Sequence, residues 1–213
     1  MKTSQNVFDY IYQKEGKSPW TFKEPPKELT NLVESELIKP CKMLDVGCGE
    51  GYISTYLASN GFDVTGIDIS SNAIKLSKKH AIKKQVKCKF LQMGWKQLSN
   101  TKEKFDLVID WRFFHEITGD KEREEYVNIV SNLLKRKGKY LSVAFSGEFK
   151  EWGKGKLRKS PIGVTLCLPH NDELEKLFRK YFNIVQKKMI KVPEKGMRGG
   201  ITSYFFLMEK KTK

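Results

Sequence analysis

The stretch Met43–Ser54 reads MLDVGCGEGYIS, and it decides how the chain is expected to fold. Its apolar run is broken by Asp45, and glycines then follow at alternate positions, Gly47, Gly49 and Gly51. Glycine is the residue that lets a backbone turn tightly and come close to a neighbouring group. Aliphatic and small residues resume after the turn. The stretch therefore predicts a strand, a tight turn that approaches a ligand, and a helix.

From Lys42 onward, strand-like and helix-like segments alternate. The pattern predicts strands at residues 42–46, 63–69, 88–93, 105–110 and 138–146, and two more near 182–190 and 203–210. It predicts helices at residues 52–60 (ended by Gly61), 73–84 (after Ser70 as N-cap), 121–137 (between Asp120 and Gly138) and 172–182 (after Asn171).

This alternation predicts an α/β protein with right-handed crossovers and a parallel sheet covered on both faces. Only a loop separates the last two strands, so we expect them to pair as an antiparallel hairpin at the end of the sheet. The predicted fold is Rossmann-like and doubly wound, with a mostly parallel seven-stranded sheet and a C-terminal antiparallel hairpin.

Composition is that of a globular chain with one domain and at most a small appendage. The 213 residues are 39% apolar and 31% charged. No run approaches the length of a membrane span, and the first residues lack the apolar core of a signal peptide. The four cysteines form no CxxC pair, and no histidine stands at metal-ligand spacing. We expect a cytoplasmic protein without a membrane span or a metal site.

The net charge of +15 raises the question of nucleic acid as a partner. Only six of the 40 basic residues are arginine, although phosphate and base recognition favours the planar arginine fork. The lysines are spread along the chain, and no RNA- or DNA-binding motif accompanies them. The composition favours a solvated basic surface and leaves nucleic-acid binding as the alternative.

The turn at Gly47–Gly51 differs from a dinucleotide-binding turn. In doubly wound folds, ligands bind beyond the carboxyl ends of the strands, and dinucleotides use the spacing G-x-G-x-x-G. Here the spacing is G-x-G-x-G, and Tyr52 stands where the third glycine is needed. The negative charge of Asp45 would also repel a pyrophosphate. The turn therefore predicts a cationic or neutral ligand and argues against NAD.

The end of the second predicted strand supplies the next candidate residues. Asp68 ends the run DVTGID, and a carboxylate at this place can accept hydrogen bonds from both hydroxyls of a ribose. Ile69 beside it offers an apolar surface to an adenine ring.

Together, LDVGCGEG and the following GIDIS resemble motifs I and II of the class I S-adenosylmethionine-dependent methyltransferases. The likeness continues through FLQMGW, FDLVID and LLKRKGKYLSVAF, and it is strong from about residue 41 to 146. It implies that the glycine-rich turn lies against the methionine and ribose parts of S-adenosylmethionine. It also implies that Asp45 helps to hold the ammonium group, that Asp68 binds the ribose, and that Asp110 and Trp111 face the methionine part. The cofactor-binding residues expected from this resemblance are Asp45, Gly47, Cys48, Gly49, Gly51, Tyr52, Asp68, Ile69, Met93, Gly94, Trp95, Asp110 and Trp111.

The sequence departs from this family at the end of the third strand. Many relatives have an Asp there that accepts the adenine amino group, whereas this chain has Gly94. We expect adenine recognition to depend on backbone groups and on apolar contact with Met93 and Trp95. A core position for Trp95 is the alternative.

The methyl acceptor is expected to be a small molecule whose nucleophilic atom (sulfur, oxygen or nitrogen) the sequence leaves open. The chain lacks the N/D-P-P-Y/F stretch of exocyclic-amine DNA methyltransferases and has no room for a target-recognition domain. His115 follows the fourth strand and is the candidate general base, which is needed only if the acceptor holds its proton tightly; a structural role is the alternative. The sequence is also compatible with an RNA or protein methyltransferase that uses the lysine-rich surface, and with a non-catalytic S-adenosylmethionine-binding protein.

Residues 1–40 form an aromatic, proline-broken leader that loosely resembles the N-terminal segment of thiol, thiopurine and tellurite-resistance methyltransferases. By that resemblance the leader is a lid, with Tyr10, Tyr12 and Trp20 walling the substrate pocket, and residues 41–213 form the methyltransferase domain. A helix packed on the sheet is the alternative. Residues 154–174 interrupt the strand–helix pattern, and we expect them to form a loop over the acceptor side.

Overall fold

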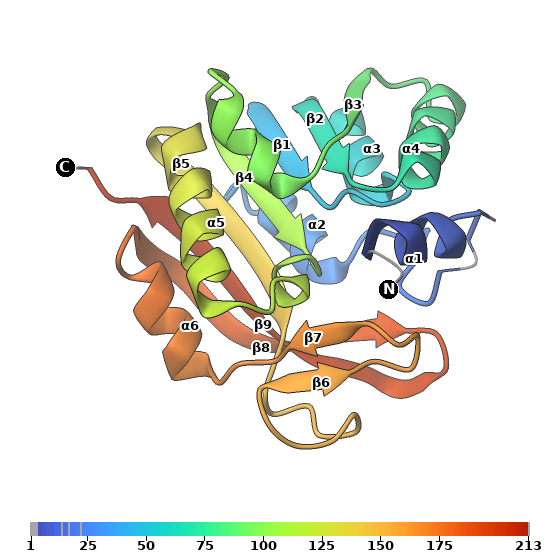
Figure 1. Ribbon diagram of the computed structural model, residues 1–213. Coiled ribbons are helices and arrows are strands. Elements are labelled where there is room, and N and C mark those ends of the chain that lie inside the picture. Colours follow the sequence, from blue (N-terminus) through green and yellow to red (C-terminus); the bar gives the residue numbers. More distant parts are fainter. Residues whose placement is uncertain (1–3, 14, 17, 22, 213) are drawn as a thin grey trace.

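The structure, a computed structural model, describes residues 4–13, 15–16, 18–21 and 23–212. Its centre is a seven-stranded sheet with the strand order β3-β2-β1-β4-β5-β9-β8 (Figure 1). Pairing is parallel from β3 through β5, and β9 lies antiparallel between β5 and β8. The predicted fold class is confirmed, including the C-terminal hairpin. The strands are β1 (Lys42–Val46), β2 (Asp63–Asp68), β3 (Cys88–Gln92), β4 (Phe105–Trp111), β5 (Leu134–Phe145), β8 (Phe182–Glu194) and β9 (Met197–Lys210).

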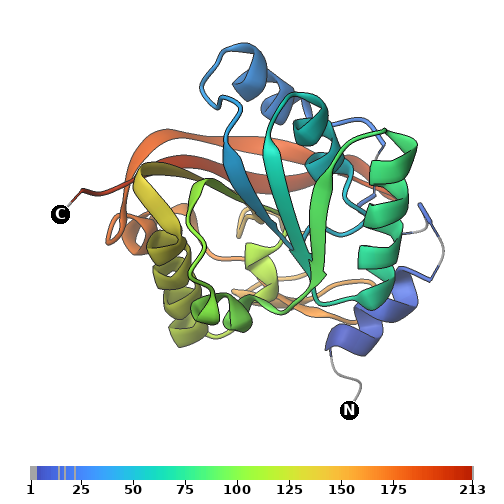
Figure 2. The ribbon, with the colours of Figure 1, turned by 90° about the horizontal axis from the view of Figure 1, so that it is seen from above.

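Helices cover both faces of the sheet (Figure 2). One buried cluster joins the sheet to α5 and α6, and a second joins the opposite face to α2 and α3. The helices are α1 (Ser4–Ile11), α2 (Lys27–Glu34), α3 (Tyr52–Ser59), α4 (Ser71–Lys83), α5 (Asp120–Leu133) and α6 (Asn171–Phe178), with short 3₁₀ helices η1 (Trp95–Asn100) and η2 (Phe114–Glu116).

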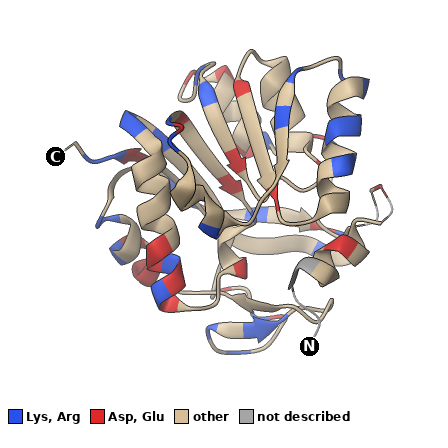
Figure 3. Ribbon diagram, turned by 45° about the horizontal axis from the view of Figure 1, so that its top comes forward, with Lys and Arg blue, Asp and Glu red and all other residues tan. Residues whose placement is uncertain are grey.

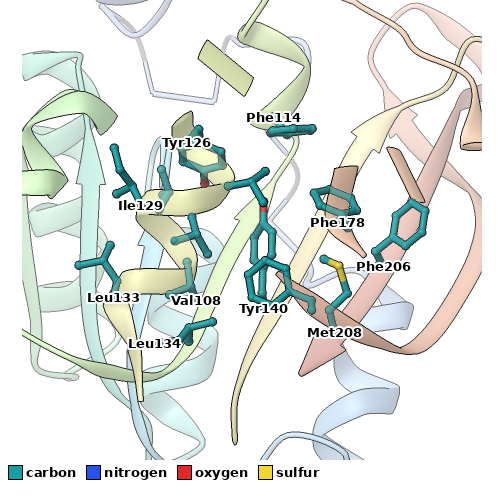
Figure 4. Close-up of a cluster of buried hydrophobic side chains, with 14 of the residues drawn as sticks. Val108, Phe114, Tyr126, Ile129, Leu133, Leu134, Tyr140, Phe178, Phe206 and Met208 are labelled. Atoms are coloured by element: carbon teal, nitrogen blue, oxygen red, sulfur yellow. The ribbon is translucent and has the colours of Figure 1, made fainter. Parts of the chain in front are cut away.

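The central strands divide their apolar side chains between the two faces. On β4, Leu107 and Ile109 belong to the cluster under α2 and α3, whereas Val108 belongs to the cluster under α5 and α6. Successive side chains of a strand point to opposite faces, so a strand covered on both sides is apolar at every position. Figure 4 shows the cluster under α5 and α6, where Tyr126 and Phe178 from the helices meet the strands.

Several boundaries differ from those predicted; α6, for example, ends at Phe178 and not at residue 182. Helix α5 ends at Leu133, and β5 begins at once with Leu134, which pairs with Phe105 of β4 and is only 1% exposed. Burial of Leu134 on the sheet therefore outweighs the helix propensity of the following lysines and arginine, and the helix predicted to reach residue 137 is four residues too long. Helices α5 and α6 begin one residue earlier than predicted, at Asp120 and Asn171. The cap at Ser70 is confirmed, because its hydroxyl accepts the Ala73 N–H at 3.1 Å.

The segment expected to be a loop contains a second, two-stranded sheet. It is formed by β6 (Leu157–Lys159) and β7 (Thr165–Cys167), which pair antiparallel. Leu166 and Leu168 pack with Phe145 and Phe149 in a separate apolar cluster. Three-residue strands carry too little periodicity to be recognised in a sequence, which explains why this sheet was not predicted.

Asp110 lies in the core and does not face a ligand site. Its side chain is completely buried, and it accepts hydrogen bonds from the hydroxyls of Tyr126 (2.9 Å), Tyr140 and Ser142 (2.7 Å). Burial raises the pKa of Asp110 to about 7, against the effect of these three donors. The prediction that Asp110 faces the methionine part of the cofactor is wrong, because the side chain points toward the α5 face of the sheet.

We expect Asp110→Ala to lower the free energy of unfolding by about 3–5 kcal/mol, because three buried hydroxyls lose their acceptor. Asp106→Ala is the matched control on the same strand. It breaks a surface ion pair with Lys135 and should cost about 0–1 kcal/mol. Urea unfolding followed by circular dichroism measures both, and equal losses would contradict a core role for Asp110.

Candidate functional site

A single large cavity of about 910 Å³ opens at the carboxyl ends of β1, β2 and β4, in the part of the chain that the structure describes. The strand order reverses between β1 and β4, and ligands bind at such switch points in doubly wound folds. The turn after β1, the leader, η2, the β6–β7 segment and the tip between β8 and β9 contribute its walls. The volume lies in the range of sites for drug-sized ligands.

The glycine-rich turn has a left-handed backbone at all three glycines. The φ angles of Gly47, Gly49 and Gly51 are +70°, +54° and +76°, which side chains strongly disfavour. A Cβ atom on Gly47 would lie 2.8 Å from the ring of Phe113, and one on Gly49 would lie 2.8 Å from Tyr12 Oη. The glycines are therefore required by backbone conformation and by protein side chains packed against the turn.

Asp68, at the end of β2, carries a carboxylate with acceptor capacity to spare. Its Oδ2 accepts the Gly49 N–H and its Oδ1 accepts the Ser70 N–H, both at 2.9 Å. Each oxygen keeps a further lone pair, and the residue lines the cavity. Burial raises the pKa of Asp68 to about 6, although the two backbone donors oppose the rise. The carboxylate form therefore predominates at neutral pH.

Asp45 lies deeper, at 2% exposure, and accepts the Ser54 hydroxyl at 2.6 Å. Burial raises its pKa to about 7, against the effect of this bond, and the charge of Asp68 raises it further. The group is therefore poised between its two protonation states. A cation that enters the cavity would favour the ionised form.

The end of β3 presents an apolar wall. Met93, Gly94 and Trp95 all line the cavity. The Met93 N–H already donates to the Asp68 carbonyl at 2.9 Å, and the Gly94 N–H donates to Gln97 Oε1 at 2.9 Å. Because both N–H groups already have acceptors within the protein, this wall offers a ligand mainly apolar contact.

The leader is attached to the turn through Glu50. This residue is 3% exposed, and its carboxylate accepts hydrogen bonds from the Gly16 N–H (3.1 and 3.2 Å) and the Thr21 hydroxyl (3.0 Å). The Ser18 hydroxyl lies 3.4 Å from the same carboxylate. Glu50 stands inside the GCGEG turn, so the same turn that shapes the cavity also holds the segment that covers it.

Two further elements hold the leader. At the N-terminus of α4, the Asp9 carboxylate accepts the Ser70 hydroxyl at 2.7 Å. At the tip between β8 and β9, the Lys195 N–H donates to the Pro19 carbonyl at 2.8 Å. Within the leader, Trp20 Nε1 donates to Tyr12 Oη at 2.7 Å, and both rings line the cavity.

The wall opposite β1 and β2 begins after β4. Arg112, with φ of +70°, forms an ion pair with Glu194 of β8 and donates to the Pro193 carbonyl at 3.0 Å. His115 is 3% exposed and stacks on Phe145, with centroids 3.8 Å apart. Burial, and then the charges of Arg112 and Arg123, hold the pKa of His115 well below its usual range.

The structure gathers most of the predicted site residues around the cavity. Tyr10 is an exception, since it is 72% exposed and does not line it, so the prediction that Tyr10 walls the pocket is wrong. Gly51 is another, because it packs on Ser77 of α4. Asp110 lies in the core, as described above. The predicted residues that do line the cavity are Asp45, Gly47, Cys48, Gly49, Tyr52, Asp68, Ile69, Met93, Gly94, Trp95, Trp111, His115, Tyr12 and Trp20.

The cavity is rich in acidic residues although the chain is basic. Seven acidic and four basic residues line it: Glu24, Glu28, Asp45, Glu50, Asp68, Glu116 and Glu194, against Lys27, Arg112, Lys191 and Lys195. Arg112 is neutralised by Glu194, and Lys195 Nζ donates to the Ser18 carbonyl at 3.0 Å. The described residues contain no cluster of His, Cys, Asp and Glu that could hold a metal ion. Nor is any helix among them long and apolar enough to cross a bilayer.

Five of the seven acidic residues of this lining were not assigned from the sequence, among them Glu50, Glu116 and Glu194. Glu50 was visible inside the glycine-rich turn, but its partners in the leader are set by tertiary contact. Glu116 adjoins His115, but no sequence pattern marks it as part of the site. Glu194 lies 82 residues from Arg112 in sequence, and no local pattern connects the two.

Residues 38–191 match a family of methyltransferase domains. The chain belongs to this family. The resemblance found in the glycine-rich turn is thereby confirmed, together with the predicted enzyme class, and S-adenosylmethionine as the cofactor agrees with it.

Individual relatives are more distant. The chain is similar to a ubiquinone biosynthesis O-methyltransferase of Coxiella burnetii, with 26% identity over 127 residues, which are 60% of this chain and 53% of the relative. It is also similar to the 2-heptyl-1-hydroxyquinolin-4(1H)-one methyltransferase of Mycobacteroides abscessus, with 26% identity over 148 residues, 66% of this chain and 64% of the relative. The chain spans about half the length of the curated relatives it matches.

A solved structure shares the fold over nearly the whole chain. It is the 1,6-didemethyltoxoflavin-N1-methyltransferase of Burkholderia thailandensis, crystallised with 1,6-didemethyltoxoflavin and S-adenosylhomocysteine. Its TM-score is 0.77 at 19% identity, and the match covers 98% of this chain and 87% of that one.

We expect Glu50→Ala to release the leader without unfolding the domain. The carboxylate makes charge-assisted hydrogen bonds to residues 16–21, and such bonds contribute about 1.5–3 kcal/mol. Hydrogen exchange of residues 16–21 should then become about 10-fold faster or more. Glu34→Ala, at the exposed end of α2, is the control. Unchanged exchange in Glu50→Ala would show that the other contacts are enough to hold the leader.

Proposed function

We propose that this protein transfers the methyl group of S-adenosylmethionine to a small, largely apolar acceptor. The observation that carries the proposal is one enclosed cavity with two kinds of wall. The turn after β1 and Asp68 form a polar, acidic side, and aromatic and aliphatic side chains form the other. Both sides lie at the switch point of a methyltransferase-family fold.

The residues on the acidic side fit the cofactor. The spare lone pairs of Asp68 suit the two hydroxyls of a ribose, and the apolar surfaces of Ile69, Met93 and Trp95 suit an adenine ring. Asp45 can hold an ammonium group through its charge or through the hydroxyl of Ser54. When bound, the cofactor supplies a methyl group that its sulfonium makes electrophilic, and the aromatic rings of the lining favour that cation.

The other side of the cavity suits an acceptor. Phe145, Trp152 and Leu166 belong to one apolar cluster and line the cavity together with Ile162 and Met197. The leader closes this space through Tyr12 and Trp20. The protein's task is to align donor and acceptor and to exclude water, which a covered apolar pocket does.

The oxygen of a hydroxyl is the acceptor atom that we favour. Two curated relatives act, by name, in O-methylation or on a hydroxyquinolone, and a planar hydroxylated ring fits walls made of aromatic side chains. Nitrogen remains the second choice, as in the toxoflavin enzyme named above.

The basic surface supports the alternative of a nucleic-acid acceptor less well. Figure 3 shows Lys and Arg residues on elements at both sides of the molecule, with no single basic face. Exposed lysines such as Lys75 on α4, Lys102 before β4 and Lys187 on β8 lie on separate elements. A phosphate-binding track requires basic groups in a row.

Cofactor binding is tested first. We expect calorimetry to show binding of S-adenosylhomocysteine and little binding of NAD. Asp68→Asn should weaken S-adenosylhomocysteine binding by about 10- to 150-fold, which corresponds to losing charge-assisted hydrogen bonds of about 1.5–3 kcal/mol. The control is Asp63→Asn at the exposed, opposite end of β2, which should bind normally. Equal affinities in the two variants would remove Asp68 from the cofactor site.

The acceptor class is tested by a screen with a radiolabelled methyl donor. We expect methylation of small phenols or of 1-hydroxyquinolin-4-one, and weak binding of bulk RNA. Binding driven by phosphate contacts falls steeply as salt rises. Tight RNA binding with a steep salt dependence, and no methylated small molecule, would favour the nucleic-acid alternative.

A further inference from the structure

Glu116, the last residue of η2, places a carboxyl group in the wall of the cavity. Its side chain is 22% exposed, and the residue is part of the cavity lining. Among the described residues, none donates a hydrogen bond to this carboxyl, whereas Asp45, Glu50 and Asp68 each accept at least one. The acceptor capacity of Glu116 is therefore available to a bound molecule.

The neighbouring His115 is held in one tautomer. Its Nδ1 accepts the backbone N–H of Phe145 at 3.3 Å, so the neutral ring carries its proton on Nε2. That Nε2 lies 3.9 Å from Glu116 Oε1. With Nδ1 occupied and Nε2 protonated, His115 has no free lone pair for a substrate proton. The ring instead turns a polar N–H toward the carboxyl of Glu116.

Among the described residues, no Lys or Arg side chain forms an ion pair with Glu116. Arg112 is the nearest cationic group, but it is engaged by Glu194 of β8 and the Pro193 carbonyl. Asp68, at the end of β2, adds a like charge across the cavity. Burial, as the largest cause, raises the pKa of Glu116 to about 8, while Arg112 lowers it and Asp68 raises it. A group that titrates near neutrality is suited to general-base catalysis.

We propose that Glu116 is the general base that takes the proton of an O–H or N–H acceptor, and that His115 is a positioning residue for it. This inference rests on the proposed function. In this step the acceptor's O–H bond breaks and its proton passes to a Glu116 oxygen. The electron pair left on the acceptor oxygen forms the bond to the methyl carbon, and the pair of the C–S bond stays on sulfur as S-adenosylhomocysteine.

The same carboxyl could instead serve as an anchor for the cofactor's positive charge. The two roles differ in what Glu116→Gln changes. As a base, Glu116 affects turnover and leaves binding of S-adenosylmethionine nearly intact, whereas as an anchor for the sulfonium it affects binding of S-adenosylmethionine first. Asp68 already supplies the acidic group beside the turn, and Glu116 belongs to the wall that continues through His115 to Phe145 on the acceptor side. The position therefore favours the base.

Single-turnover methylation measures the effect, with the phenol or 1-hydroxyquinolin-4-one methylated in the screen as probe. We expect Glu116→Gln to be about 100-fold slower or more, which is the usual loss when a general base is removed. The wild-type rate should rise about 10-fold per pH unit up to about pH 8, since only the ionised carboxylate accepts a proton, and the variant should lack this rise. Glu125→Gln, at an exposed position of α5, is the matched control and should behave as wild type.

A second readout needs no turnover. The carboxyl band that disappears in Glu116→Gln can be titrated by difference infrared spectroscopy, and its pKa should be lower with S-adenosylmethionine bound than with S-adenosylhomocysteine, because only the first is a sulfonium. Affinity of Glu116→Gln for S-adenosylmethionine, measured without acceptor, should stay within about 3-fold of wild type. A loss of 10-fold or more, or full turnover in the variant, would overturn the proposal. Binding of S-adenosylhomocysteine with no methylated probe would overturn the proposed function itself.

The positioning role of His115 predicts a change in the pH profile of the methylation rate. His115→Ala removes the N–H beside Glu116, which favours the ionised carboxylate. We therefore expect the pH at which the rate rises to move upward, with a smaller loss of rate at high pH than in Glu116→Gln. An unchanged pH profile with a uniform loss of rate would assign His115 a structural role only.

Discussion

The left-handed backbone of the turn after β1 is the constraint on which the rest of the site depends. Three positive φ angles within five residues bring the chain back across the end of β2, where the Cys48 N–H donates to the Ile67 carbonyl and the Gly49 N–H donates to Asp68. These bonds fix Asp68, and the turn places Glu50 where its carboxylate accepts hydrogen bonds from the leader. The conformation of this one turn therefore shapes the bottom of the cavity and holds the leader that covers it.

Burial of carboxyl groups in this cavity disfavours their ionised forms, and this decides which charge on a ligand the site favours. The pKa values of Asp45, Asp68 and Glu116 are all raised, because each group is removed from water and the groups repel one another. A bound cation favours the ionised forms. On the proposed function, such a site binds a sulfonium more tightly than the neutral thioether left after transfer, which favours release of the product.

The fold was largely predictable because its signals are local. Each central strand is a short, mainly apolar run, and Ser70 is a cap that the sequence shows directly. The cofactor side was predictable for the same reason, since Asp45, Asp68 and the glycines lie within 24 residues of one another. The errors arose where tertiary contact decides. Leu134 leaves the helix to pair with β4, and Asp110 turns toward Tyr126 and Tyr140. Tyr10 lies on the outer side of α1, whose other aromatic residue, Phe8, lines the cavity.

Part of the cavity wall comes from segments outside the family match. Tyr12 and Trp20 precede residue 38, and Glu194 and Met197 follow residue 191, yet all four line the cavity. They meet because Lys195 donates to the leader and Arg112, just after β4, pairs with Glu194 of β8. A change of acceptor can therefore arise at the two ends of the chain while the turn and Asp68 stay as they are. For this protein, the apolar walls and the carboxyl of Glu116 describe the proposed acceptor more closely than the names of relatives that are 26% identical over 127 and 148 residues.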